Sequence, residues 1–274
     1  MQEQCGSSYS GASGNEMEVN NMNYNLNNPI VKRNTKVVYE DNGNTIKLFN
    51  EGYSKADILN EALNQARVEE NTDLRIAKLK EVTVMDNKTA IVSDHIKGKT
   101  LEQLMNEHPE NMDKYLNLFV DIQIEIFTKR VMLINRMKDK YKSRISSSNM
   151  YSEEIKYDLL QRLEGMKNHT KLCHGDFVPS NIILTDNGEW YVIDWAHVTQ
   201  GNASGDVATT YLQFCMDNKK DLAEKYMNLY AEKTNTDKNY IKNWIPIVAA
   251  NRLYKQKPEE KELLKQWIDV VEPQ

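Results

Sequence analysis

The chain has 274 residues, of which 40% are hydrophobic, and this content is enough for the buried core of one domain or a two-lobed unit. Its 35 Lys and Arg residues against 40 Asp and Glu give a net charge of -5, without the basic excess that general nucleic-acid binding requires. No stretch approaches the roughly 20 apolar residues that span a bilayer. We therefore expect neither a nucleic-acid nor a membrane partner.

Residues 1–28 differ in composition from the rest of the chain. They are rich in Asn, Ser, Gly and Glu and have almost no aliphatic side chains. Such a segment buries too little apolar surface to offset the entropy lost on ordering, so it is predicted to be a disordered tail. It shows no basic start followed by an apolar run, and we expect no secretory signal.

The three cysteines indicate the redox environment. Cys5, Cys173 and Cys215 form neither a metal-ligand spacing nor a disulfide framework. A reducing, cytoplasmic setting is therefore expected.

A strand pattern begins at Pro29. Residues 36–40 and 45–50 have strand-forming side chains and flank the turn sequence DNGN, which predicts a hairpin. Ser54 is a suitable N-cap for the following helix. That helix is predicted to bury an apolar face made of Ala56, Leu59, Leu63 and Ala66. Two further strands are expected over residues 78–85 and 89–96, with a turn between them.

The remainder is predicted to be mainly helical. Residues 93–98 lead into a helix over residues 101–107, for which Thr100 is the expected cap. Apolar periodicity predicts further helices over residues 112–137, 155–166, 206–216, 222–231, 240–253 and 260–270. The polar, serine-rich stretch KDKYKSRISSSN, residues 138–149, is interpreted as a loop.

Polar residues suited to catalysis or metal binding are concentrated in residues 172–195, LCHGDFVPSNIILTDNGEWYVIDW. The apolar runs 181–184 and 190–193 flank the turn sequence DNG and predict a short hairpin, with Asn181 and Asp194 at its open ends. Asp176 lies on the loop just before it. Because a hairpin returns its ends to one place, these oxygen-bearing side chains are expected to converge. Oxygen ligands are the kind that Mg²⁺ takes and shares with substrate phosphates, so the stretch predicts a magnesium and phosphate site.

The segments HGDFVPSN, VIDW and GNASGDVATTYL resemble the phosphotransferase family that includes aminoglycoside phosphotransferases and choline kinases, relatives of the protein kinases. Kinases share the order of an Asp, an Asn five positions later and a further metal-binding Asp. The resemblance implies a two-lobed, protein-kinase-like α+β fold. Residues 29–97 would form a small lobe with an antiparallel sheet and one helix, and residues 98–274 a larger helical lobe with the catalytic loop and acceptor site.

The resemblance also implies a role for each motif residue. Asp176 would orient the acceptor hydroxyl and receive its proton. His174 is assigned to the same catalytic loop, which it would brace through hydrogen bonds. Asn181 and Asp194 would hold Mg²⁺. Asp206 would brace the catalytic loop, although it is equally suited to cap the following helix.

Three residues are predicted to contact the nucleotide. By resemblance, Lys47 in the second strand reaches the phosphates and is held by Glu61 of the next helix; both side chains are otherwise solvated surface charges. The segment IVKRNTKVVY, residues 30–39, lacks the glycines with which kinase-like folds often cover the phosphates. Thr35 offers a hydroxyl donor there.

The expected function is transfer of the γ-phosphate of ATP or GTP, with Mg²⁺, to a hydroxyl of an aminoglycoside, amino alcohol or sugar-like acceptor. The acidic net charge suits a cationic acceptor slightly better. Which acceptor and nucleotide are used, whether the protein confers antibiotic resistance, and its oligomeric state stay open.

Three alternatives remain beside this expectation. The missing glycines, and Val178 where relatives often carry a second His, are compatible with an inactive nucleotide-binding protein of the same fold. His174, Asp176, Asp194 and His197 have the spacing of ligands in a metal-dependent hydrolase. A protein kinase is disfavoured because no D-F-G and A-P-E segment follows Asp194.

Overall fold

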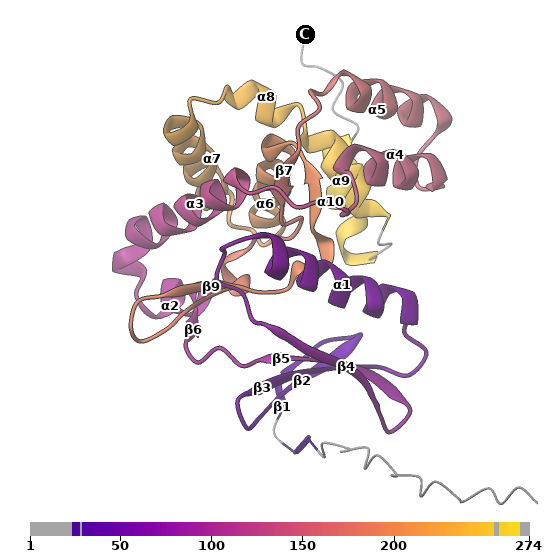
Figure 1. The fold of residues 1–274 in the computed structure, drawn as a ribbon. Coiled ribbons are helices and arrows are strands. Elements are labelled where there is room, and N and C mark those ends of the chain that lie inside the picture. The colour runs from indigo at the N-terminus through magenta and orange to yellow at the C-terminus, as the bar shows by residue number, and fades with distance from the viewer. Residues whose placement is uncertain (1–23, 28, 255–257, 269–274) are drawn as a thin grey trace, which may run out of the picture.

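The computed structural model describes residues 24–27, 29–254 and 258–268. Its N-terminal part is a five-stranded antiparallel sheet in the order β1-β2-β3-β5-β4, with one helix between this sheet and the rest of the chain (Figure 1). The elements are β1 (Pro29–Lys32), β2 (Lys36–Asp41), β3 (Asn44–Phe49), α1 (Lys55–Asn71), β4 (Leu79–Met85) and β5 (Lys88–Asp94). Both predicted hairpins and the Ser54 cap are confirmed, and strand β1 is an addition to the prediction.

Side-chain alternation along β3 decides what faces the helix. Ile46 and Leu48 pack in a cluster on one face of the sheet, whereas Phe49 packs with Ile91 and with Ile58 of α1 on the other. Successive strand residues point to opposite faces, so Lys47 shares the face of Phe49. A lysine in a half-buried strand is thereby directed toward α1.

The buried face of α1 differs from the prediction. Leu59 and Leu63, expected in the core, are 46% and 47% exposed, while Glu61, Asn64 and Gln65 are buried. Polar groups on this face find fixed partners: Asn64 donates to the backbone oxygen of Ala196 at 3.3 Å, and Gln65 donates to that of Ala77 at 2.6 Å. Because buried polar groups are hydrogen-bonded, these contacts stabilise a helix that turns its carboxylate and amides toward the rest of the protein.

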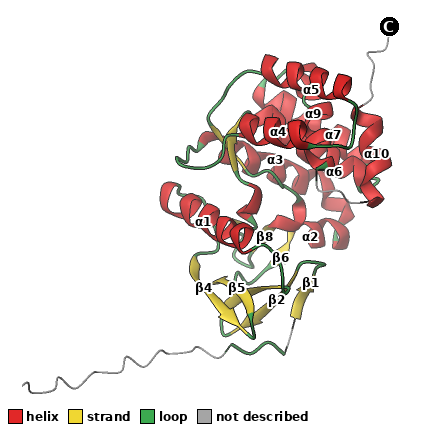
Figure 2. Cartoon of the chain, turned by 90° about the vertical axis from the view of Figure 1, so that its right-hand side faces the viewer, coloured by secondary structure: helices red, strands yellow, loops and turns green. Residues whose placement is uncertain are grey.

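The rest of the described chain is mainly helical (Figure 2). Its elements are β6 (Lys99–Thr100), α2 (Leu101–Glu107), η1 (Pro109–Asn111), α3 (Met112–Thr128), α4 (Met137–Ser147), α5 (Glu153–Gly165), β7 (Lys171–Cys173), η2 (Pro179–Asn181), β8 (Ile182–Leu184), β9 (Trp190–Val192), η3 (Trp195–His197), β10 (Thr199–Gly201), α6 (Ala203–Met216), α7 (Lys220–Thr234), α8 (Lys238–Lys242), α9 (Ile245–Leu253) and α10 (Pro258–Ile268). The two-lobed α+β architecture is as expected.

Two predicted helix boundaries are wrong. The helix expected over residues 112–137 ends at Thr128, and residues 138–149, expected to be a loop, are largely helix α4. Three apolar side chains at four-residue spacing, Met137, Tyr141 and Ile145, are buried and anchor this otherwise polar helix. The sequence pattern does not reveal so narrow an apolar stripe, because mainly Lys and Ser residues occupy the other positions of the helix.

The second boundary concerns the expected helix over residues 240–253. It is two helices, α8 and α9, with Asn243 and Trp244 between them and Pro246 in the first turn of α9. Proline has no N–H to donate and is favoured in a first turn, which explains the break.

The core of the helical part fixes the loop between β7 and η2, which carries the predicted catalytic residue Asp176 and which we call the catalytic loop. Phe177 of that loop is fully buried, and its ring stacks on Phe119 of α3 with 4.5 Å between centroids. Phe119 also contacts Phe214 of α6 and Tyr226 of α7. An aromatic anchor held by three helices gives the loop a rigid base.

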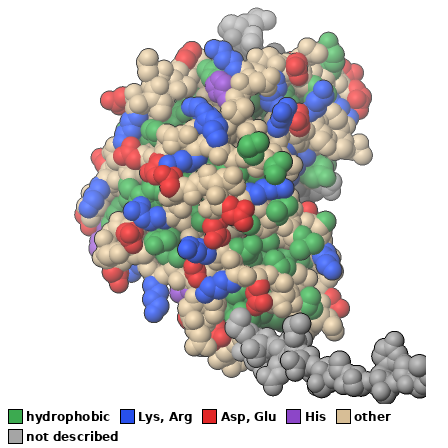
Figure 3. All heavy atoms as spheres, viewed as in Figure 1, with side chains coloured by type: hydrophobic (Ala, Val, Ile, Leu, Met, Phe, Trp, Pro, Cys, Tyr) green, Lys and Arg blue, Asp and Glu red, His purple; other side chains and the backbone are tan. Residues whose placement is uncertain are grey.

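Further expectations concern the surface and the ends of the chain. In the part of the chain that the structure describes, no helix combines the length and apolar character needed to cross a membrane. Acidic and basic side chains are interspersed over the face seen in Figure 3. The predicted tail lies outside the described residues apart from residues 24–27.

Candidate functional site

A cleft of ≈ 390 Å³ lies between the sheet and the helical part. The sheet contributes Val31, Val38 and Lys47, and the opposite wall includes Asn181 and Asp194. The segment expected to link the lobes also lines the cleft, through residues 93–96 and 98. Lys47, predicted to contact the nucleotide, therefore meets the predicted metal residues Asn181 and Asp194 at one cavity.

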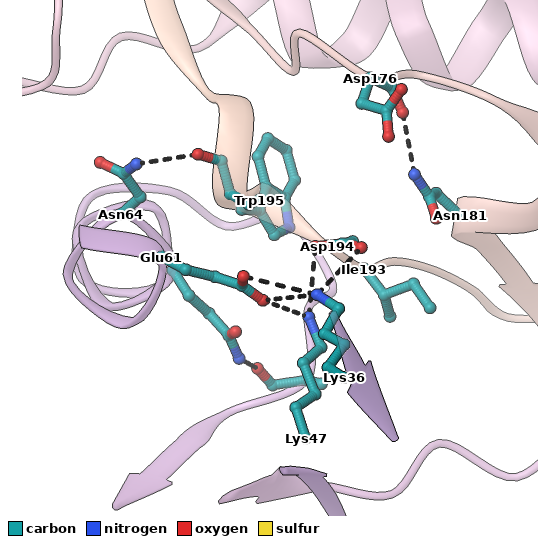
Figure 4. Close-up of polar contacts among 12 residues, drawn as sticks. Lys36, Lys47, Glu61, Asn64, Asp176, Asn181, Ile193, Asp194 and Trp195 are labelled. Carbon is teal, nitrogen blue, oxygen red and sulfur yellow. Dashed lines mark hydrogen bonds and ion pairs between the residues drawn. The ribbon is translucent and has the colours of Figure 1, made fainter. Parts of the chain in front are cut away.

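Four charged side chains meet in this cleft (Figure 4). The ammonium group of Lys47 lies 2.8 Å from a carboxylate oxygen of Glu61 and 3.3 Å from one of Asp194. Lys36 lies 3.3 Å from Glu61 and 3.8 Å from Asp194. Two cations and two carboxylates thus form a balanced cluster that joins β2, β3, α1 and the end of the β8–β9 hairpin. We call it the ion cluster.

The ion cluster favours the charged forms of Lys47 and Asp194. Burial acts to lower the pKa of Lys47, but Asp194 and Glu61 outweigh it and hold that pKa well above its ordinary value. Burial likewise acts to raise the pKa of Asp194, but Lys47 and Lys36 hold it well below its ordinary value. The cleft therefore presents the carboxylate of Asp194 and the ammonium group of Lys47 in their charged forms.

Lys36 was missed by sequence reasoning, although the strand register contains the signal. It pairs directly with Phe49 across β2 and β3, and paired residues of an antiparallel ladder share a face. Phe49 lies on the face of Lys47, so Lys36 does too, and its ammonium group stands 5.3 Å from the Phe49 ring centroid. Thr35, in contrast, is exposed and does not line the cleft, and its role stays a prediction.

The β8–β9 hairpin brings Asn181 and Asp194 to its open end. The backbone N–H of Ile193 donates to the backbone oxygen of Asn181 at 2.9 Å, which closes the hairpin beside both residues. The Asn181 side chain donates to the backbone oxygen of Asp176 at 2.9 Å. Its amide oxygen is thereby turned away from this contact.

Asp194 has a backbone conformation that non-glycine residues seldom adopt. Its φ is 65° and its ψ 59°, in the left-handed region. Such strain persists where surrounding contacts over-determine it, and it concentrates at functional sites. Here the ion cluster and the hairpin supply those contacts.

His174 and Asp206 brace the catalytic loop. His174 is fully buried; its Nε2 donates to the backbone oxygen of Ile193 at 3.0 Å, and its Nδ1 accepts from the N–H of Asp176 at 3.3 Å. The buried Asp206 carboxylate accepts the N–H groups of His174 at 3.2 Å and Gly175 at 2.7 Å. Since both His174 nitrogens are engaged, neither has a lone pair for a metal ion, which argues against the hydrolase alternative.

Gly175 is required by close backbone contact. Its φ is +78°, and an added Cβ would lie 2.3 Å from the backbone oxygen of His197. Gly175→Ala is expected to destabilise the fold by more than about 2 kcal/mol and to displace Asp176, because strain and overlap add. Thermal unfolding and activity assays check this.

Gly188→Ala is the matched control. Gly188 has a similar positive φ of +82°, but nothing lies within 4 Å of an added Cβ. It should cost about 1 kcal/mol from backbone strain alone and leave activity intact. Equal losses in the two variants would show that the contact with His197 is unimportant.

The donor atoms suit Mg²⁺. The Asn181 amide oxygen and the Asp194 carboxylate are hard oxygen ligands, the kind that Mg²⁺ uses beside substrate phosphates. No group of three His, Cys, Asp or Glu side chains suited to a metal occurs among residues 24–27, 29–254 and 258–268. A Mg²⁺ held by few protein ligands and completed by phosphate oxygens fits this arrangement.

Comparison with known proteins agrees with this geometry. The sequence profile of the phosphotransferase enzyme family matches residues 147–242, about one third of the chain, including the catalytic loop and the β8–β9 hairpin. No curated protein sequence matches the chain.

Solved structures show the same fold. The chain is similar to a thermostable mutant of aminoglycoside phosphotransferase APH(4)-Ia, with a TM-score of 0.66, 12% identity, and coverage of 89% of this chain and 92% of that one. It is also similar to the choline kinase LicA from Streptococcus pneumoniae, with a TM-score of 0.57, 15% identity, and coverage of 86% and 90%. The predicted resemblance and the kinase-like fold are thereby confirmed.

Complexes of such neighbours contain nucleotides. A ternary complex of an APH(4)-Ia mutant with AMP-PNP and hygromycin B matches with a TM-score of 0.63 and 14% identity, covering 88% of this chain and 89% of that one. These nucleotides and acceptors belong to the neighbours.

Proposed function

We propose that the protein is a kinase that transfers the γ-phosphate of ATP, with Mg²⁺, to a hydroxyl group of a small molecule. The observation that carries the proposal is the meeting of two predicted sets in one cleft. Lys47 and Glu61 pair and reach Asp194, while Asn181 contacts Asp176 through a hydrogen bond. Only transfer from a metal-bound phosphate uses all of these groups together.

The nucleotide would lie in the cleft. Lys47, held by Glu61 and joined by Lys36, would contact the phosphate oxygens, and the segment of residues 93–98 would meet the base. Mg²⁺ bound by Asn181 and Asp194 would neutralise charge that develops on the transferring phosphate. Arg33, in the glycine-free turn between β1 and β2, also lines the cleft and adds a further cation.

The reaction needs one proton acceptor. The acceptor oxygen forms a bond to the γ-phosphorus while the bond from that phosphorus to the bridging oxygen breaks, and ADP leaves. The hydroxyl proton passes to the Asp176 carboxylate. Because the transition state is loose, Asp176 contributes chiefly by orienting the hydroxyl, and the barrier falls mostly through positioning and charge neutralisation.

A transfer assay tests the proposal. Purified protein is incubated with Mg²⁺, ATP and small hydroxyl compounds that include aminoglycosides, amino alcohols, sugars and hydroxy acids, and products are identified by mass spectrometry. A phosphorylated product that disappears in Asp176→Asn is the expected result. Nucleotide affinity is measured in parallel, and failure to bind MgATP would refute the kinase assignment.

Lys36 and Lys47 should contribute unequally to nucleotide affinity. Lys47 lies closer to both carboxylates, so Lys47→Met is expected to raise the Kd for MgATP more than about tenfold. Lys36→Met should raise it about threefold. Titration with a fluorescent ATP analogue measures both, with the exposed Lys32→Met as control. An unchanged Kd in Lys36→Met would place this lysine outside the phosphate contacts.

The cellular setting is also proposed. Cys173 and Cys215, the two cysteines among the described residues, are buried and free. Free thiols persist in reducing compartments, and a cytoplasmic kinase would meet both ATP and reductant there.

A further inference from the structure

Beside Asp176, on the side of the helical part, lies a second and smaller recess. It measures ≈ 30 Å³ and is lined by Asp176 of the catalytic loop together with residues of the three helices α4, α6 and α9. Lys140 and Arg144 come from α4, and Asn251 and Arg252 from α9. Asp176 lines this recess and, under the proposed function, orients the hydroxyl of the phosphate acceptor. A group bound in the recess would therefore belong to the acceptor.

The charges of the recess are mainly positive. Lys140, Arg144 and Arg252 line it, and Asp176 is the one carboxylate among its described lining residues. Arg252 is already compensated: its guanidinium lies 2.8 Å from Glu260 in a two-point ion pair. Lys140 donates to the backbone oxygen of His197 at 3.2 Å.

Arg144 is the decisive residue. Its guanidinium donates to the Asn251 side chain at 3.0 Å and lies 5.2 Å from the ring centroid of Tyr254. No carboxylate among the described residues lies within 4.0 Å of it, and Asp57 acts on it only at longer range. Arg144 is partly buried, and burial lowers the pKa of its side chain.

Such an arrangement is incomplete without an anion. A guanidinium has five N–H donors in a planar fork that matches the two oxygens of a carboxylate or a phosphate. Removing part of its water without an ionic partner costs free energy that a bound anion would recover. Asn251 and the Tyr254 ring meanwhile hold the fork in place, so little side-chain entropy is lost on binding.

We propose that Arg144, assisted by Lys140, binds an anionic group of the phosphate acceptor. This inference rests on the proposed kinase function and specifies its substrate class: an alcohol that carries a carboxylate or phosphate. The recess admits one small group, since its ≈ 30 Å³ is only about two to three times the space that a single water molecule needs. The remainder of the acceptor, with its hydroxyl, would extend past Asp176 toward the cleft.

The acidic net charge of the chain favoured a cationic acceptor, whereas the recess favours an anionic one. An aminoglycoside carries several ammonium groups, and these would meet Lys140 and Arg144 with the same sign of charge. Like charges placed together at a binding site weaken binding, and such repulsion is a common source of specificity. The acidic average of the whole chain does not describe this pocket.

Matched acceptor pairs provide the test. Homoserine is compared with aminopropanol, glycerate with glycerol, and a hexose phosphate with the free hexose, and an aminoglycoside is added as a polycation. Transfer from MgATP and binding by calorimetry in the presence of MgADP are both measured. The carboxylate pairs and the phosphate pair separate the two sources of anionic charge.

Variants in helix α4 test whether Arg144 binds the anionic group. Arg144→Gln keeps much of the side-chain length and removes the charge, Arg144→Lys keeps the charge without the fork, and Lys142→Gln removes an exposed charge two residues away. In Arg144→Gln the KM and Kd for the preferred anionic compound should rise at least about tenfold, and kcat should change less than about threefold. Arg144→Lys should recover part of the loss. Lys142→Gln and the MgATP affinity of all variants should match the unaltered protein.

The outcomes separate this inference from the kinase proposal. Saturable binding of an anionic compound that weakens in Arg144→Gln supports the inference whether or not phosphate is transferred. Preference for the neutral or cationic member of each pair, equal effects of Arg144→Gln and Lys142→Gln, or no binding of any anionic compound would overturn it. Transfer to no compound, with intact anion binding, would count against the kinase proposal alone.

Discussion

Replacing Asp176 by Asn is expected to lower kcat about 10²- to 10³-fold while the Kd for MgATP changes less than about twofold. The variant keeps the shape of the side chain but removes the proton acceptor, whose contribution falls in this range when the transition state is loose. Asp176 is joined to the metal and nucleotide residues through its backbone oxygen, which accepts from Asn181 and is unchanged by the substitution. Steady-state kinetics and nucleotide titration measure the two effects separately.

Asp186→Asn is the control for this experiment. Asp186 lies in the exposed turn of the β8–β9 hairpin, so the same chemical change there should alter neither kcat nor nucleotide affinity. If Asp176→Asn instead raised the Kd for MgATP strongly and left kcat at saturating MgATP unchanged, Asp176 would be a nucleotide or metal residue and the assigned roles would be reversed.

The largest loss is expected from Asp194→Asn. Asn keeps the size of the side chain and tolerates the left-handed backbone conformation with φ 65°, so the hairpin should fold normally. The variant removes the charge that faces both Lys47 and Lys36 and, under the proposed function, replaces a carboxylate ligand of Mg²⁺ by a neutral amide. Turnover should fall at least about 10³-fold, because charge neutralisation at the transferring phosphate is the main catalytic effect.

A Mg²⁺ titration tests whether the loss of turnover in Asp194→Asn comes from weaker metal binding. In the unaltered protein, added Mg²⁺ should strengthen nucleotide binding, and in Asp194→Asn this strengthening should be lost while binding of metal-free ADP persists. Asp86→Asn is the control, since Asp86 is also a left-handed aspartate, with φ 47°, but sits in the exposed β4–β5 turn. Unchanged Mg²⁺ dependence in Asp194→Asn would remove this residue from the metal site.

The sequence revealed those residues of the ion cluster and the catalytic loop that lie on the same hairpin or on neighbouring elements. Asn181 and Asp194 flank a hairpin whose turn chemistry is explicit, and such a turn returns its two ends to one place. Lys47 and Glu61 come from adjacent elements, and their predicted contact is present at 2.8 Å. Short-range geometry of this kind depends on few residues.

Long-range packing could not be inferred in the same way. Sequence periodicity placed Leu59 and Leu63 of α1 in the core, but the helix buries Glu61, Asn64 and Gln65 instead. Hydrogen-bond partners on distant loops stabilise that orientation, and no local pattern reveals them. Lys36 was overlooked because its place beside Lys47 depends on strand register.

The sequence by itself determined the hairpin with Asn181 and Asp194 at its open end and Asp176 just before it, because a short turn dictates where its two ends lie. Its motifs, through the family that they resemble, also predicted the kinase-like fold and the pairing of Lys47 with Glu61. Only the tertiary structure decided the surroundings of the acceptor. Helix α4 resembles a loop in sequence, since only a narrow stripe of its side chains is apolar, and it becomes a helix by packing that stripe on the core. Packing α4 against α9 brings Arg144 to Asn251, more than a hundred residues away in the chain, and so sets the charge of the recess beside Asp176.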